Sequence, residues 1–223
     1  MSDLTASPTA LAIGAIIGAG AGLYAHRTAN MALTKAVENR FDTSPARAMP
    51  SSALTALGAT AGLLIGARFG IQARLPAYLY LAAIAPALGA VDAVTRRLPN
   101  RILLPAYPAG TALLGFAAWQ DGDAGALWRS LLAGALLYAA FMAVALMSPP
   151  GSLGWADVKL VGVLGLFLGF LGWTTVWLGI MIAFGLAALY AVLRALVRRG
   201  QRGQVLPLGP ALLLGSLTAV IVS

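Results

Sequence analysis

The sequence predicts an all-α, polytopic integral membrane protein with about eight transmembrane helices and its N-terminus outside. Of the 223 residues, 60% are hydrophobic and only 10% are charged, and the mean hydropathy is +0.85. A soluble domain of this size carries about 25% charged residues. The chain instead contains repeated apolar runs near the roughly 20 residues that a membrane-spanning helix needs, separated by short basic connectors.

Eight apolar runs are candidate spans. They cover residues 9–25, 52–70, 76–94, 102–119, 127–147, 158–173, 174–195 and 205–222. The sixth run is short for a bilayer, so we expect local thinning or shielding by neighbouring helices. We divide the chain into a two-helix region, residues 1–75, and a six-helix core, residues 76–223.

The basic residues set the expected orientation. The net charge of +8 could suggest a nucleic-acid partner, but the basic residues are scattered through connectors, so we expect no nucleic-acid binding. With the N-terminus outside, all but three of the fifteen Lys and Arg residues fall inside. The exceptions are Arg68, Arg74 and Arg129. In this topology Asp92 and Asp157 both lie at cytoplasmic helix ends.

The chain has no cysteine, which excludes disulfides, Cys-zinc sites and thiol chemistry. We expect neither a metal nor a cofactor. The N-terminus does not resemble a signal peptide, because Asp3 is the only charged side chain before Arg27 and no basic segment precedes the apolar run.

Glycines recur at four-residue spacing in the first two runs. They are Gly14, Gly18 and Gly22, then Gly58, Gly62, Gly66 and Gly70. Small residues on one face let membrane helices approach closely, so we expect these two faces to pack together. A ligand channel along them is the alternative.

The connector of residues 27–51 has two interpretations. Leu33, Val37 and Phe41 follow helical spacing, which favours a short amphipathic helix on the inner membrane surface. A mobile polar loop is equally compatible with the sequence. We interpret the single histidine, His26, as an interfacial residue or helix cap rather than a ligand.

Two aspartates stand at the edges of apolar runs. Asp92 lies near the end of the third run, where a charged side chain costs free energy of insertion. Considered alone, it could pair with Arg96, four residues later on a helix. Asp157 follows a Pro-Pro-Gly break at residues 149–151 and precedes the sixth run. Considered alone, it favours a helix N-cap.

Together the two acids favour catalysis, because they share one membrane face and one depth in the expected topology. Two carboxylates in one partly desolvated site do not both ionise easily, so they tend to share a proton. One can act as a base on water while the other, protonated, polarises a carbonyl group. Such a pair titrates as a unit, and the proton is not assigned to either member.

Three segments carry motifs in a fixed order. Residues 92–100 are Asp-Ala-Val-Thr-Arg-Arg-Leu-Pro-Asn, residues 154–160 are Gly-Trp-Ala-Asp-Val-Lys-Leu, and residues 206–211 are Leu-Pro-Leu-Gly-Pro-Ala. They resemble, respectively, the first aspartate motif, the Gly-x-Gly-Asp-x-Lys-Leu motif and the terminal Pro-x-Gly-Pro of the type IV prepilin peptidases. The resemblance covers most of the chain.

The resemblance implies an intramembrane aspartic endopeptidase that removes the leader of type IV pilin-like precursors at the cytoplasmic face of the inner membrane. It implies that residues 76–223 form the peptidase core, with Asp92 and Asp157 as the catalytic pair. The residues expected to support them or lie near the substrate are Lys159, Gly154, Ala156, Arg96, Pro99 and Asn100. For Lys159, a side chain that snorkels to the lipid headgroups is an equal alternative.

The sequence departs from the family in two places. Ala156 replaces the second motif glycine, and alanine disfavours positive φ, so we expect the loop to sit differently. The connector of residues 27–51 has no cysteine, so it lacks the zinc loop of longer family members. We therefore predict peptidase activity without N-methyltransferase activity.

Two other functions fit the sequence less well. One is a proton- or ion-coupled transporter, in which buried acids pass ions between helices. The other is a catalytically inactive family member that serves as an assembly scaffold. For the leading interpretation, the expected partners are prepilin-like substrates, the lipid bilayer and components of pilus or secretion assemblies.

Overall fold

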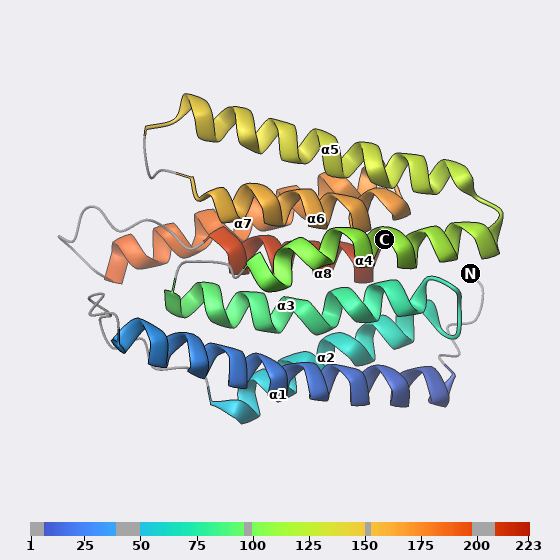
Figure 1. The fold of residues 1–223 in the computed structure, drawn as a ribbon, viewed down its shortest axis with the longest axis horizontal. Coiled ribbons are helices and arrows are strands. Elements are labelled where there is room, and N and C mark those ends of the chain that lie inside the picture. The colour runs from blue at the N-terminus through green and yellow to red at the C-terminus, as the bar shows by residue number, and fades with distance from the viewer. Residues whose placement is uncertain (1–6, 39–49, 96–99, 150–152, 198–207) are drawn as a thin grey trace. The chain divides into compact units, whose positions relative to one another are not determined.

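A computed structural model describes residues 7–38, 50–95, 100–149, 153–197 and 208–223 (Figure 1). Over these ranges the chain forms helices and no strands. The helices are α1 (Pro8–Glu38), α2 (Ser51–Phe69), α3 (Leu75–Thr95), α4 (Asn100–Asp121), α5 (Ala124–Met147), α6 (Trp155–Leu171), α7 (Trp173–Val197) and α8 (Leu208–Val222).

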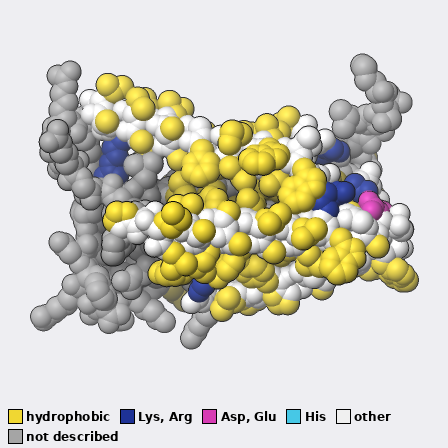
Figure 2. Space-filling view, turned by 90° about the horizontal axis from the view of Figure 1, so that it is seen from above, with side chains coloured by type: hydrophobic (Ala, Val, Ile, Leu, Met, Phe, Trp, Pro, Cys, Tyr) yellow, Lys and Arg dark blue, Asp and Glu magenta, His cyan; other side chains and the backbone are white. Residues whose placement is uncertain are grey.

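Each helix covers one of the predicted apolar runs, which confirms the all-α, polytopic membrane fold. Six of the described helices, α1 to α5 and α7, are long and apolar enough to cross a membrane. The other two are shorter, with 17 residues in α6 and 15 in α8. Hydrophobic side chains dominate the face seen in Figure 2, as expected for a surface that meets lipid tails.

The first helix is longer than the sequence suggested. The prediction ended the span near residue 25 and began a connector at Arg27, but α1 continues to Glu38. The segment that contains Leu33 and Val37 is therefore an extension of α1 rather than a separate helix. Residues 39–49, which include Phe41, lie outside the described residues. His26 consequently sits inside α1 and not at a helix end.

The chain divides into two compact units, Met1–Trp128 and Arg129–Ser223. In the first unit, α1 packs against both α2 and α3, and α2 also contacts α3. The predicted glycine faces meet as expected, except at Gly70, which ends α2 and has open space around an added Cβ. A methyl group added to Gly18 would overlap the carbonyl group of Gly58, and one on Gly14 would overlap that of Gly62. Backbone contact at these positions leaves no space for a channel between α1 and α2.

In the second unit, α6 is the central helix. Almost every residue from Val158 to Phe170 is buried, and both α7 and α8 contact α6. A single residue, Gly172, joins α6 to α7, and its φ of 154° lies in a region that favours glycine. The predicted division at residues 75 and 76 remains a prediction.

Candidate active site

Asp92 lies near the C-terminal end of α3 and is 5% exposed. Among the residues described, no other acidic side chain is buried. Its neighbour Val91 belongs to a buried cluster with Ala87 and Ala90 of α3, Ala25 of α1 and Leu54 of α2, and Ile102 of α4 packs against this cluster. A carboxyl group placed beside such an apolar cluster costs free energy, which makes Asp92 a candidate for function rather than fold.

The first motif spans the connection between α3 and α4. Asn100 is the first residue of α4 and is exposed. Arg96 and Pro99 lie outside the described residues, so the alternative ion pair between Asp92 and Arg96 remains a prediction. The motif thus joins the buried end of one helix to the exposed start of the next.

Asp157 lies in the first turn of α6 and is half-buried. The helix begins at Trp155 with Gly154 as its N-cap residue, and the N–H groups of Asp157 and Val158 both donate to the Gly154 carbonyl, at 3.0 and 3.3 Å. The prediction that Asp157 could be the N-cap is therefore wrong. The helix starts three residues earlier than the apolar run, and Asp157 is its third residue.

Gly154 leaves room for the Asp157 carboxylate. A Cβ atom built on Gly154 would lie 3.1 Å from Asp157 Oδ2, closer than most carbon contacts of real side chains. The backbone of Gly154 has φ −75° and ψ 134°, which any residue can adopt. Glycine at this position is thus explained by the close approach of the carboxylate and not by backbone strain.

Ala156 is the second residue of α6 and is half-buried. The expectation that alanine would alter a loop through positive φ is wrong, because position 156 is helical and not part of a loop. Alanine is the most favourable residue in a helix. The departure from the motif glycine therefore suits this local structure.

Lys159 is half-buried between two buried residues, Val158 and Leu160. It follows Asp157 by two positions on the same helix. Side chains two positions apart on a helix do not face each other.

Asp92 belongs to the first compact unit and Asp157 to the second. Each acid has its own surroundings, an apolar cluster for Asp92 and a helix N-terminus for Asp157. His26 Nε2 lies 3.0 Å from Asn30 Nδ2 within α1. Among the described residues, no three His, Asp or Glu side chains come together as a metal site.

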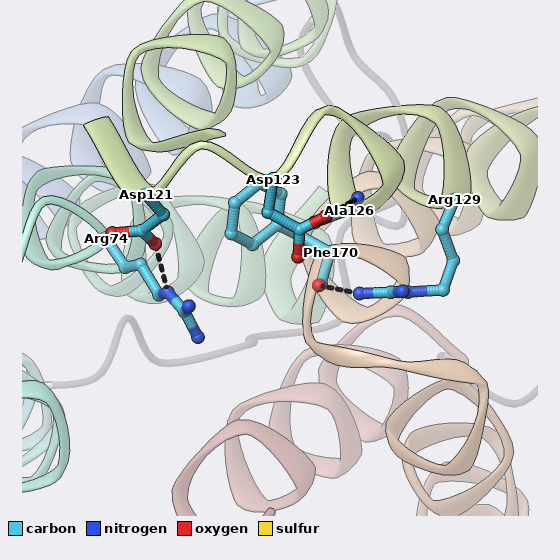
Figure 3. A network of polar contacts seen from close by, with 6 residues as sticks. All are labelled: Arg74, Asp121, Asp123, Ala126, Arg129 and Phe170. Atoms are coloured by element: carbon cyan, nitrogen blue, oxygen red, sulfur yellow. Dashed lines mark hydrogen bonds and ion pairs between the residues drawn. The ribbon is translucent and has the colours of Figure 1, made fainter. Parts of the chain in front are cut away.

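Two polar residues of α5 were missed by the sequence analysis, which treated Arg129 as an ordinary basic residue on the outer side. Arg129 is half-buried and donates to backbone carbonyls at the end of α6, and Figure 3 shows its bond to Phe170. Ser130 is 1% exposed and donates to the carbonyl of Leu166. The available signal was that both residues lie inside the apolar run of residues 127–147.

The other charged groups in Figure 3 belong to the first unit. Arg74 pairs with Asp121 through a 2.8 Å contact between Arg74 Nε and Asp121 Oδ2. Asp123 precedes α5, and its Oδ1 accepts a hydrogen bond from the Ala126 N–H at 2.9 Å, as an N-cap residue does.

The sequence profile described as "Type IV leader peptidase family" matches residues 79–192, just over half of the chain. The chain belongs to this family. The match contains Asp92, Asp157 and all the other residues singled out around them. It ends before the Pro-Leu-Gly-Pro segment at residues 207–210, whose resemblance to the terminal family motif remains a prediction.

Three curated relatives agree with this family, and each is named "Prepilin leader peptidase/N-methyltransferase". The protein from Bacillus subtilis (strain 168) is 31% identical over 160 residues, which cover 70% of this chain and 59% of the relative. The Pseudomonas putida protein is 26% identical over 162 residues, covering 71% and 54%. The Stutzerimonas stutzeri protein is 24% identical over 163 residues, covering 72% and 55%.

The matched part of this family member thus spans between half and three-fifths of the length of each relative. No solved structure shows a significant match to the chain.

Proposed function

We propose that the chain is an intramembrane aspartic endopeptidase that cleaves the leader peptide of type IV pilin-like precursors, with Asp92 and Asp157 as its catalytic pair. The observation that carries this proposal is that the family match at residues 79–192 includes both aspartate motifs. The burial of Asp92 and the space kept open beside Asp157 support it, because neither feature is needed to build the helices.

The proposed reaction uses only these two carboxyl groups and a water molecule. The ionised carboxylate takes a proton from water as the water oxygen attacks the carbonyl carbon of the scissile bond. The protonated partner donates its proton to the carbonyl oxygen, giving a neutral tetrahedral intermediate. When the C–N bond breaks, the proton taken from water passes to the leaving nitrogen, and one hydroxyl of the intermediate returns its proton to the second carboxylate. The new carboxyl and amino ends then leave.

The position of Asp157 fits one half of this mechanism. The first-turn N–H groups of a helix lack helical partners and carry partial positive charge. They stabilise a negative carboxylate near the start of α6. The buried surroundings of Asp92 instead disfavour a second charge. This difference favours a pair with a single proton.

The proposed location is the cytoplasmic membrane, with both acids near the cytoplasmic face and the N-terminus outside. It rests on the distribution of basic residues, which gather in the connectors on one side. The substrate would be a membrane-inserted precursor with a basic leader. The basic connectors would repel such a leader, so we assign them to anionic lipid. Components of pilus or secretion assemblies are the expected further partners.

The test is cleavage of a prepilin precursor in reconstituted membranes by the wild type, Asp92→Asn and Asp157→Asn. Asparagine keeps the size of the side chain and removes its acid chemistry. We expect each variant to fold and to lose at least about 1,000-fold in kcat. The matched control is Asp121→Asn, which removes an exposed acid and its pair with Arg74 and should leave kcat within about twofold.

Two outcomes would contradict the proposal. If either catalytic variant cleaves at the wild-type rate, that aspartate has a structural role. If the wild type cleaves no precursor but its acids support ion flux across the vesicle membrane, the chain is a transporter. The same assay with S-adenosylmethionine tests the expectation of peptidase activity alone, since a methylated product would overturn it.

A further inference from the structure

The end of α6 opposite to Asp157 is held by side chains of α5. The last carbonyl groups of a helix have no partner within the helix. At the end of α6, Arg129 Nε donates to the carbonyl of Gly169 at 2.8 Å. Its Nη2 donates to the carbonyl of Phe170, also at 2.8 Å (Figure 3). The guanidinium charge also lies at the negative end of the helix dipole, where a cation is favoured.

A third bond from α5 reaches α6 one turn earlier. Ser130 Oγ donates to the Leu166 carbonyl at 2.6 Å, and this hydroxyl is buried. Three carbonyls of α6 thus accept hydrogen bonds from two consecutive residues of α5. These bonds are directional, so they fix the height of α6 along α5.

The surfaces that meet between α5 and α6 are made of small residues. A Cβ on Gly165 would lie 2.8 Å from Gly134 Cα, and one on Gly169 would lie 3.0 Å from the Arg129 carbonyl oxygen. Such surfaces allow close contact of two backbones. One larger side chain of α6, Leu166, packs against Gly134 of α5 between these close contacts.

Helix α6 also needs an anchor for reasons of length and composition. Its 17 residues measure about 25 Å, less than the roughly 30 Å thickness of the hydrocarbon core. Three of its residues, Gly162, Gly165 and Gly169, are poor helix formers. The apolar contacts that surround it are non-directional, so the hydrogen bonds from α5 add a directed constraint on its axial position.

We propose that Arg129, assisted by Ser130, is a positioning residue that sets the axial position of α6 and thereby the depth of Asp157. The catalytic consequence rests on the proposed function, since it requires Asp157 to be a catalytic acid. The effect is transmitted along about 18 Å of helix between Gly169 and Asp157. Arg129 itself does not touch the reacting atoms.

Because the chain contains no cysteine, a single introduced cysteine can report the position of α6 without background labelling. A single cysteine introduced as Trp155→Cys, at the exposed first residue of α6, is labelled with a membrane-impermeant maleimide in proteoliposomes. We expect Arg129→Ala to change the labelling rate at least about threefold, because thiol reactivity follows its surroundings. Arg129→Lys should give an intermediate rate, since lysine keeps the charge but cannot reach both carbonyls with one planar fork.

In the cysteine-free chain the same variants should lower kcat. A displacement of the catalytic acid by about 1 Å can cost about 100-fold in kcat, with little change in KM. Ser130→Ala removes one bond and should have a smaller effect than Arg129→Ala. The matched control is Arg74→Ala, which breaks the bond to Asp121 within the first compact unit and should leave both the labelling rate and kcat within about twofold.

The outcomes separate this inference from the proposed function. If Arg129→Ala does not fold, the decision passes to Arg129→Lys and Ser130→Ala. If the foldable variants lose thermal stability while labelling and kcat stay unchanged, Arg129 is merely structural and the inference is overturned. If labelling changes with Arg129 while the wild type cleaves no precursor, the positioning role stands and the peptidase proposal fails.

Discussion

The two helix ends that carry the acids hold the same side chain in opposite ways. Asp92 lies at the end of α3, buried beside an apolar cluster to which α1 and α2 contribute. Asp157 lies at the start of α6, half-buried, with space kept open by Gly154. Asp92 is surrounded by packed side chains, whereas Asp157 has space beside it because Gly154 has no side chain. Perturbations at the two ends should therefore differ in kind.

Short of replacing an acid, the largest effect should come from filling the space beside Asp157. Gly154→Ala places a Cβ about 3.1 Å from the carboxylate oxygen and should lower kcat about tenfold, and Gly154→Val about 100-fold. The measurement is precursor cleavage at saturating substrate. The matched control is Gly185→Ala, at a glycine of α7 with open space around its added Cβ, and kcat should stay within about twofold. Equal losses in the two proteins would show that the space at Gly154 has no specific role.

The stability of the region around Asp92, at the C-terminal end of α3, should depend on the packing between α1 and α2. A methyl group on Gly22 would overlap the carbonyl group of Leu54, a member of the cluster next to Asp92. Gly22→Ala should therefore lower the free energy of unfolding by about 1–3 kcal/mol. Gly20→Ala, on the open side of the same helix, should raise it by about 0.5–1 kcal/mol. Equilibrium unfolding in micelles measures both, and the same sign for both would contradict the packing seen at Gly22.

The two catalytic variants should change stability by different amounts. Asp92→Asn replaces a buried side chain, whose surroundings disfavour a charge, with a neutral side chain of similar shape, so the free energy of unfolding should stay nearly unchanged. Asp157→Asn removes a negative charge from the first turn of α6 and should lower the free energy of unfolding by about 0.5 kcal/mol. Thermal and denaturant unfolding at neutral pH test this. Equal losses in the two variants would mean that the two acids have similar surroundings.

The smallest effect should follow from restoring the family glycine. Ala156→Gly changes a helical position where alanine is the better residue, so it should lower stability by about 0.5–1 kcal/mol. We expect kcat to stay within about twofold, because no positive φ is required at this position. A large gain in cleavage would show that the methyl group of Ala156 obstructs the site.

The helices could be predicted because apolar runs and basic connectors are local properties of the sequence. The glycine faces of α1 and α2 were equally readable, since four-residue spacing places them on one side of each helix. The start of α6 was not, because the apolar run begins at Val158 while the backbone turns into a helix at Trp155. This shift of three residues changed Asp157 from an expected cap to a first-turn acid and moved Ala156 into the helix.

The position of Arg129 inside an apolar run indicated a buried side chain, but its partners could not be predicted, for a different reason. Its acceptors are the backbone carbonyls of Gly169 and Phe170. Every residue has a backbone carbonyl, so the sequence does not indicate which ones accept a hydrogen bond. The distribution of charges could place Arg129 near a membrane edge, but it could not show that the guanidinium group donates hydrogen bonds to α6. The pairing of Asp92 with Asp157 is a proposal that rests on motif order and family membership.

Because Gly172 alone links α6 to α7, the C-terminal end of α6 can act as a pivot about which the helix tilts. Its C-terminal end is tied to α5 by directed bonds and to α7 by a single residue. Tilting a rod about a fixed end displaces each point in proportion to its distance from that pivot. Over about 18 Å, a tilt of about 2° moves Asp157 by about 0.6 Å. Small rotations at the C-terminal end of α6 therefore produce larger displacements at Asp157, where the proposed chemistry takes place.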